Sequence, residues 1–137
     1  MAGLKRFSVS IEEALLSRFD RLIEARGYPT RSKAVSDLIR DSLVEAEWQG
    51  GKEVAAAVVM VYDHHRRNLS ERLTSIQHDH HELVISTQHI HLDHDNCLEI
   101  VVVRGAPGRV SALANALKAT KGVKYCSLAA ASTGESI

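Results

Sequence analysis

The sequence predicts an α+β chain of two domains, a short β-α-α segment followed by a βαββαβ domain. Along the chain, apolar residues switch between alternating spacing, typical of strands, and helical spacing, and they do so in that order. Length and composition agree with two domains, because 137 residues with 45% hydrophobic and 25% charged side chains suit two small folded domains. Gly50-Gly51 separates the two patterns. We therefore expect a first domain at residues 1–49, a linker at 50–52 and a second domain at 53–137.

The first domain begins with a predicted strand at residues 5–11, where polar and apolar side chains alternate. Its polar face carries Arg6, Ser8 and Ser10, and its apolar face carries Phe7, Val9 and Ile11. Ser10 and Glu13 have the spacing of a capping box and open a helix that Gly27 ends. Thr30 or Ser32 can cap a second helix that reaches about Trp48.

A lone strand with two helices leaves apolar faces uncovered and both strand edges exposed. Pairing with the same strand of a second copy satisfies both needs. We therefore expect an intertwined dimer with a two-stranded antiparallel ribbon.

The second domain has six predicted elements, ordered strand, helix, strand, strand, helix, strand. They are strand 53–62, helix 66–80, strand 83–92, strand 97–104, helix 108–121 and strand 123–131. This order is that of the ferredoxin-like split βαβ arrangement, and the fold by itself says little about function.

The basic end of the first domain is a candidate DNA-binding surface. The net charge is zero, but residues 1–33 hold seven Lys/Arg against four Asp/Glu. A two-stranded ribbon fits the major groove of B-DNA, so Arg6, Ser8 and Ser10 are predicted to contact bases. Backbone N–H groups at Thr30, Arg31 and Ser32, the start of the second helix, suit a phosphate. A merely solvated strand face is the alternative.

The segment Gly27-Tyr28-Pro29-Thr30-Arg31-Ser32 bears on that choice, because it resembles the G-Y-x-x-R-S signature of ribbon-helix-helix repressors. This resemblance favours DNA binding. We expect the first domain to be a dimeric ribbon-helix-helix domain.

All eight histidines lie between His64 and His94, a clustering that indicates metal binding or pH sensing, with a solvated polar segment as the alternative. His89 and His91 point to the same face of their strand. If His91 pairs with Cys97, then Cys97 and Glu99 join that face, whereas a loop one residue shorter turns Cys97 away. Thiolate and imidazole ligands together suit Zn, Cu or Ni.

The segments 75–82 and 87–100, which contain His78 and the group His89, His91 and Cys97, resemble the nickel-binding signature of the NikR family of nickel-responsive regulators. The resemblance as a whole extends from about Lys5 to Ala130. It implies that His78, His89, His91 and Cys97 bind Ni(II), one ion per subunit, in a square-planar site at a tetramer interface, His78 coming from the partner subunit. Glu99 would hold a ligand in place.

The family is also described with a cation site between its domains that uses two acidic residues. Asp37 matches one of them, but Lys33 stands where an acidic residue is often found, so its ammonium replaces the cation or the site is lost.

The expected function is a cytoplasmic nickel-responsive repressor, a homotetramer built as a dimer of dimers, that binds a pseudo-palindromic operator and controls nickel uptake genes. Nickel would order the helix that carries Arg66 and Arg67, so that both touch phosphates.

No secretory signal is visible, and both cysteines are expected to be thiols. We do not expect an enzyme, because four protein ligands leave no coordination position for substrate. The alternatives are a ribbon-helix-helix regulator that senses another metal or a small molecule, and a metal-storage protein.

Overall fold

The structure, a computed structural model, describes residues 3–137. Its contacts divide the chain into two compact units, one ending at Asp41 and one beginning at Ser42. The division falls inside the second helix, which runs from Arg31 to Gly50. Each unit is described below by itself.

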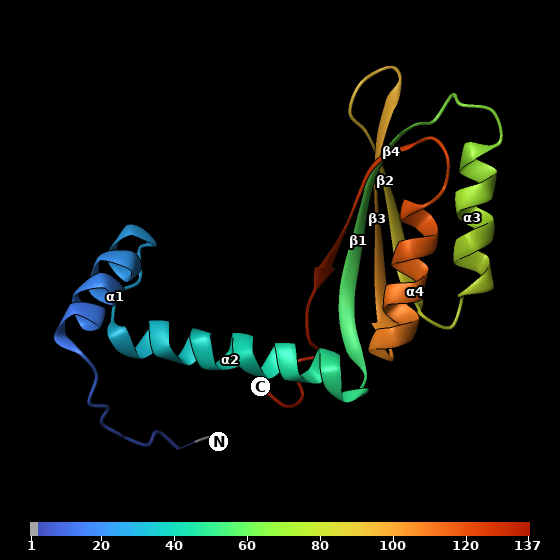
Figure 1. Cartoon of the computed structure of the whole chain (residues 1–137). Helices are drawn as coiled ribbons and strands as arrows, with labels where there is room; N and C mark the ends of the chain where they lie inside the picture. The colour runs from blue at the N-terminus through green and yellow to red at the C-terminus, as the bar shows by residue number, and fades with distance from the viewer. Residues whose placement is uncertain (1–2) are drawn as a thin grey trace. The chain divides into compact units, whose positions relative to one another are not determined.

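The first unit is helical, and its elements follow from two local features of the sequence (Figure 1). Helix α1 spans Glu13–Ala25 and closes where Gly27 adopts a φ of 75° and the Tyr28 amide donates to the Ile23 carbonyl at 2.9 Å. Helix α2 spans Arg31–Gly50, and the Thr30 hydroxyl accepts from the Lys33 amide at 3.1 Å. Of the two caps that the sequence allows, Thr30 is therefore the one used.

The N-terminal strand is the element that the single chain does not form. Among the described residues, those before α1 belong to neither helix nor strand, because a strand needs a partner to complete its hydrogen bonds. The predicted capping box is wrong. Glu12, and not Ser10, precedes α1, and no side chain in the described part of the chain caps it. The two-stranded ribbon stays a prediction about a second copy.

The second unit contains a four-stranded antiparallel sheet with two helices on one face (Figure 1). Its elements are β1 Val54–Asp63, α3 Leu69–Asp79, β2 Val84–His91, β3 Asn96–Gly105, α4 Pro107–Lys118 and β4 Val123–Ala130. The strand order β2-β3-β1-β4 places β1 and β3 at the centre of the sheet. The predicted βαββαβ order and ferredoxin-like arrangement are confirmed.

The core lies between this sheet and its helices. On β1 and β3 every second residue is buried, among them Val58 and Val101 at 0% exposure, and α4 contributes Leu113 and Leu117. Trp48 packs against this core, and its indole N–H donates to the Ala131 carbonyl at 2.8 Å.

The start of α3 differs from the prediction. The predicted helix begins at residue 66, whereas α3 begins at Leu69, after Asn68 with a φ of 64°. A residue with positive φ cannot continue an α-helix, so Arg66 and Arg67 lie in the turn between β1 and α3.

Gly122, between α4 and β4, is a glycine that the fold requires. Its φ is +105°, and a Cβ there would lie 2.8 Å from Arg66 Cδ and 3.0 Å from Leu69 Cδ2. We expect Gly122→Ala to lower the free energy of unfolding by at least about 1 kcal/mol. Gly108→Ala, in α4 with open space around its Cβ, is the matched control and should be neutral or slightly stabilising. Urea denaturation of both variants at equal protein concentration tests this, and equal midpoints would contradict it.

Candidate metal centre and nucleic-acid interface

The β2–β3 hairpin decides which side chains share a face. Its register pairs His91 with Cys97 and His89 with Glu99. Of the two registers left open by the sequence, this is the one that puts all four residues on the helix-covered face. Cys97 and Glu99 are 2% and 1% exposed, while His89 and His91 are exposed on the edge strand.

Asp93 fixes the turn that sets this register. One of its carboxylate oxygens accepts from the amides of Asp95 and Asn96 at 2.9 and 2.8 Å, and its hydrogen bonds lower the pKa of Asp93 to about 2. The turn is thereby held by a side chain that stays ionised.

Glu99 is a buried carboxylate with partners from three elements. It accepts from the Tyr62 hydroxyl at 2.6 Å and from the Gln77 side-chain amide at 2.5 Å, and His89 Nδ1 approaches it to 3.1 Å. Burial, and then the neighbouring Glu99 carboxylate, raise the pKa of Tyr62, so its hydroxyl remains a donor. Gln77 also accepts from the Thr87 hydroxyl at 2.9 Å, which ties α3 to β2. Glu99 therefore lies within hydrogen-bonding distance of Nδ1 of His89, one of the predicted nickel ligands.

Apart from one weak signal for Tyr62, local sequence patterns do not mark Tyr62 or Gln77 as residues of the site. Tyr62 continues the buried alternation of β1, and Gln77 lies one residue before His78 on α3. Their roles become visible only when the sheet register places Glu99 between them. A polar side chain at the end of an otherwise apolar alternation was the one signal available for Tyr62.

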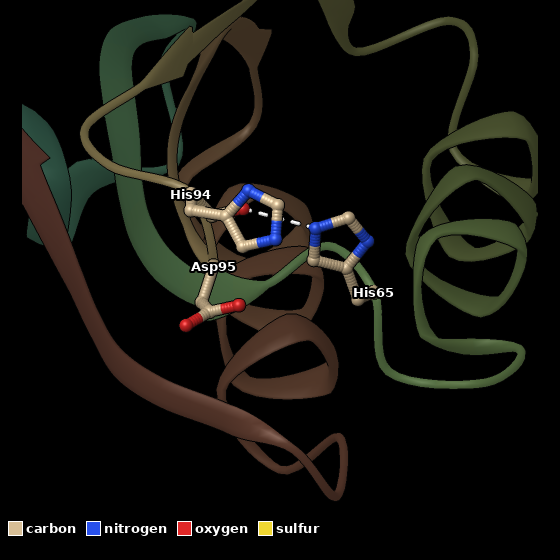
Figure 2. Close-up of side chains that lie close together, drawn as sticks. All are labelled: His65, His94 and Asp95. Carbon is tan, nitrogen blue, oxygen red and sulfur yellow. Dashed lines mark hydrogen bonds between the residues drawn. The ribbon is translucent and has the colours of Figure 1, made fainter.

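The predicted ligand atoms do not converge in the single chain. His91 instead packs its ring against His64, with ring centroids 4.6 Å apart. Within residues 3–137, three potential ligand atoms come within 4.8 Å of one another at His65, His94 and Asp95 (Figure 2) and not at the predicted site. His78 is exposed on α3 beside His81, with ring centroids 6.1 Å apart.

The side chains of His89, His91 and Cys97 are nevertheless placed where they could bind one metal ion. Directly opposed residues of an antiparallel pair have Cβ atoms about 4.5–5.5 Å apart, and residues two apart on one strand are about 6.7 Å apart. His89, His91 and Cys97 occupy such positions on one face. Side-chain rotation alone can therefore aim two imidazoles and a thiol at one ion, a combination that suits Ni, Cu or Zn.

The predicted base-contacting residues Arg6, Ser8 and Ser10 are all exposed. Of the predicted phosphate-contacting residues, Arg31 is already paired, because its guanidinium donates to the Asp20 carboxylate at 2.8 and 2.6 Å. This hydrogen bonding holds the pKa of Asp20 below its usual value. Arg31 must share or leave Asp20 to meet a phosphate.

The other predicted phosphate contacts differ in their surroundings. The Thr30 hydroxyl caps α2, while Ser32 is exposed. Arg66 and Arg67 are exposed in their turn.

Lys33 supplies a positive charge beside Asp37. Its ammonium lies 2.6 Å from Asp37 Oδ1, and the Tyr28 hydroxyl donates to Oδ2 at 3.0 Å. Hydrogen bonding from Lys33, followed by that from Tyr28, lowers the pKa of Asp37. Lys33 is thus paired with the acidic side chain that matches the family's cation site.

Both cysteines are free thiols in the described part of the chain, as expected. Cys126 is buried opposite Met60 on the neighbouring strand, and burial raises the pKa of its thiol. Cys126 is thus a small residue of the core. Within residues 3–137, no helix has both the length and the apolar character needed to span a bilayer.

Two family models match the chain. The "NikR C terminal nickel binding domain" matches residues 55–131, and the "Ribbon-helix-helix protein, copG family" matches residues 5–46. A solved structure of an uncharacterized protein from Thermotoga maritima aligns with a TM-score of 0.52 at 12% identity, covering 58% of this chain and 98% of that one. That likeness concerns the fold alone.

Curated relatives match over almost their whole length, each under the name "Putative nickel-responsive regulator". The relative from Syntrophus aciditrophicus is 52% identical over 98% of both chains. The relative from Solibacter usitatus is 53% identical over 98% of this chain and 97% of its own, and that from Geobacter metallireducens is 50% identical over 100% and 99%. With its nickel-binding-domain model, its ribbon-helix-helix model and relatives of this identity, the chain belongs to the NikR family of nickel-responsive regulators.

Proposed function

We propose that this protein is a nickel-responsive transcriptional repressor. It binds a pseudo-palindromic operator in the cytoplasm when Ni(II) occupies sites shared between subunits, and it controls genes for nickel uptake. The observation that supports this most directly is the hairpin register, which places His89, His91 and Cys97 on one face in a chain of the NikR family.

The proposed nickel site takes His89, His91 and Cys97 from one subunit and His78 from another, one ion per subunit. The exposed position of His78 on α3 leaves its ring free to reach a neighbouring chain. The Glu99 carboxylate at 3.1 Å favours a proton on His89 Nδ1, which leaves Nε2 for the metal. When bound, nickel supplies one coordination centre that links ligands of two subunits.

The proposed homotetramer is supported by apolar surface in each unit. In the first unit, the side chains of Phe7, Val9 and Leu15 are 69%, 66% and 53% exposed, which a second copy would cover. In the second unit, the sheet face opposite the helices carries partly buried apolar side chains, among them Val59 and Ile100. Two different apolar surfaces are what a dimer of dimers needs.

The proposed DNA complex has two kinds of contact, those with bases and those with phosphates. Arg6, Ser8 and Ser10 of a paired ribbon would read base edges in the major groove. Thr30, Arg31 and Ser32 at the start of α2, with Arg66 and Arg67, would contact phosphates and fix the register on the duplex. Nickel and DNA binding are coupled, so operator DNA should also tighten nickel binding.

Operator binding followed by fluorescence anisotropy tests the proposal. Ni(II), Zn(II) and Co(II) are titrated separately into the wild type and into His89→Ala. We expect nickel to tighten operator binding about 5- to 150-fold, the usual range of allosteric coupling, and His89→Ala to remove the effect. Equal operator affinity with and without nickel would overturn the sensing mechanism, and an equal response to another metal would favour a regulator of that metal.

A further inference from the structure

The arginine at the start of α2 is bound to an acidic side chain of α1. Nε and Nη2 of Arg31 donate to the two carboxylate oxygens of Asp20 at 2.8 and 2.6 Å. Both residues belong to the first unit, and their side chains are 58% and 40% exposed, so the pair lies at the surface. Arginine also binds phosphate through two parallel N–H···O bonds. Asp20 therefore occupies an edge of Arg31 that a DNA phosphate could otherwise take.

Asp20 leaves part of the Arg31 guanidinium available. A guanidinium has five N–H donors, and those that do not bond Asp20 have no partner among residues 3–137. Beside them, the first backbone N–H groups of α2 lack intrahelical acceptors, and the Thr30 hydroxyl accepts only from that of Lys33. A phosphate held at this end of α2 can therefore bond to Arg31 while Asp20 stays in place.

The pair acts differently at long and at short range. Hydrogen bonding lowers the pKa of Asp20 and raises that of Arg31, so both stay charged and their charges cancel. The field of such a pair falls off faster with distance than that of a single charge, and salt at about 0.1 M screens what remains beyond about 10 Å. A phosphate within hydrogen-bonding distance, by contrast, meets the free N–H donors directly. The pair therefore attracts distant DNA weakly and still binds a phosphate in contact.

From these observations we propose that Asp20 is a specificity-determining residue, which neutralises Arg31 toward unrelated DNA and leaves it available to the phosphate that the operator complex holds at the start of α2. This inference rests on the proposed phosphate contact of Arg31. Asp20 itself touches no DNA and acts through Arg31. Without Asp20, Arg31 would neutralise a phosphate of any duplex, and the preference for the operator would fall.

Competition anisotropy with the full-length protein tests this proposal, using operator and a duplex of unrelated sequence at several salt concentrations and saturating nickel. We expect Asp20→Asn to bind the unrelated duplex about 10-fold more tightly at about 0.1 M salt for each subunit in contact, because one more phosphate is neutralised. The salt dependence should become steeper by about one phosphate per subunit. Operator affinity should rise less, so the ratio of operator to unrelated affinity falls. Asp20→Glu keeps a carboxylate and should retain the wild-type ratio.

Two further variants separate this effect from a general change of charge. In Arg31→Gln, the additional change Asp20→Asn should alter binding to unrelated DNA little, because no guanidinium is released. Asp41→Asn is the matched control. Asp41 forms no ion pair among residues 3–137 and lies about 15 Å along α2 from Arg31, where screening is strong, so the ratio should not change. Urea denaturation checks that each variant is folded, and Asp20→Ser removes the same charge if asparagine is not tolerated.

Three results would overturn the role of Asp20. They are an Asp20→Asn variant with the wild-type ratio, an Asp20→Asn variant that binds both duplexes more weakly, and an equal gain from Asp20→Asn when Arg31 is already glutamine. Failure of the proposed function gives a different result, because nickel would then leave the operator affinity of the wild type unchanged. The binding of unrelated DNA by the Asp20 and Arg31 variants would still be measured in full.

Discussion

Cys97→Ser is expected to abolish nickel-dependent operator binding. Cys97 is the thiol directly opposite His91 in the β2–β3 register, and serine is a much poorer ligand for nickel than a thiolate. Loss of a residue that only orients a ligand costs about 10- to 100-fold in metal affinity, so loss of the ligand itself should cost at least about 100-fold. Nickel would then no longer link two subunits at concentrations that saturate the wild type.

Cys126→Ser is the matched control, because it removes the other buried thiol from a strand that carries no predicted ligand. It should keep both the thiolate-to-nickel absorption and the nickel dependence of operator binding. Dialysis gives the nickel affinity of each variant, and anisotropy gives its operator affinity. If Cys97→Ser still responded to nickel as the wild type does, the assigned ligand set would be wrong.

The sequence was informative where a pattern is long and is satisfied within one chain. All six elements of the second unit were predicted. The continuous apolar run at residues 54–62 and the helical spacing of α4 are patterns of this kind, because each reflects burial against neighbours in the same unit. The strand at residues 5–11 has an equally clear alternation, but its hydrogen-bonding partner would be another chain. Pattern therefore predicts a face to be buried and not which molecule buries it.

Local signals were less reliable than long patterns. Ser10 and Glu13 have the spacing of a capping box, but α1 begins only at Glu13, so Ser10 lies too far ahead of the helix to cap it. Residues 66–68 precede α3, because Asn68 takes a positive φ that no periodicity records. Both errors concern the first residue of a helix. Few hydrogen bonds distinguish one possible first residue from the next.

For the candidate site, the residue types were predictable and their positions were not. His89 and His91 must share a face, but Cys97 joins them only through the hairpin register, which depends on how Asp93 closes the turn. The pairing of Glu99 with Tyr62 joins residues 37 positions apart, and no local pattern predicts it.

Arg6→Ala is expected to remove most of the sequence specificity of the repressor. A bidentate arginine–guanine pair contributes about 1–3 kcal/mol of discrimination, and a ribbon presents two copies of Arg6. Operator affinity should therefore fall by about 2–6 kcal/mol per ribbon, a loss of about 30-fold or more. Binding to unrelated DNA, which depends on phosphate contacts, should change far less.

Lys5→Ala is the control for this variant, because it removes one positive charge from the adjacent residue, on the other face of the predicted strand. It should weaken binding to operator and to unrelated DNA alike and reduce the salt dependence, because a lysine contacts phosphate through its charge and reads no base. Competition anisotropy with both DNAs, at two salt concentrations and saturating nickel, separates the two effects. If the ratio of operator to unrelated affinity fell equally in both variants, Arg6 would act through its charge, and the ribbon would not read bases through this residue.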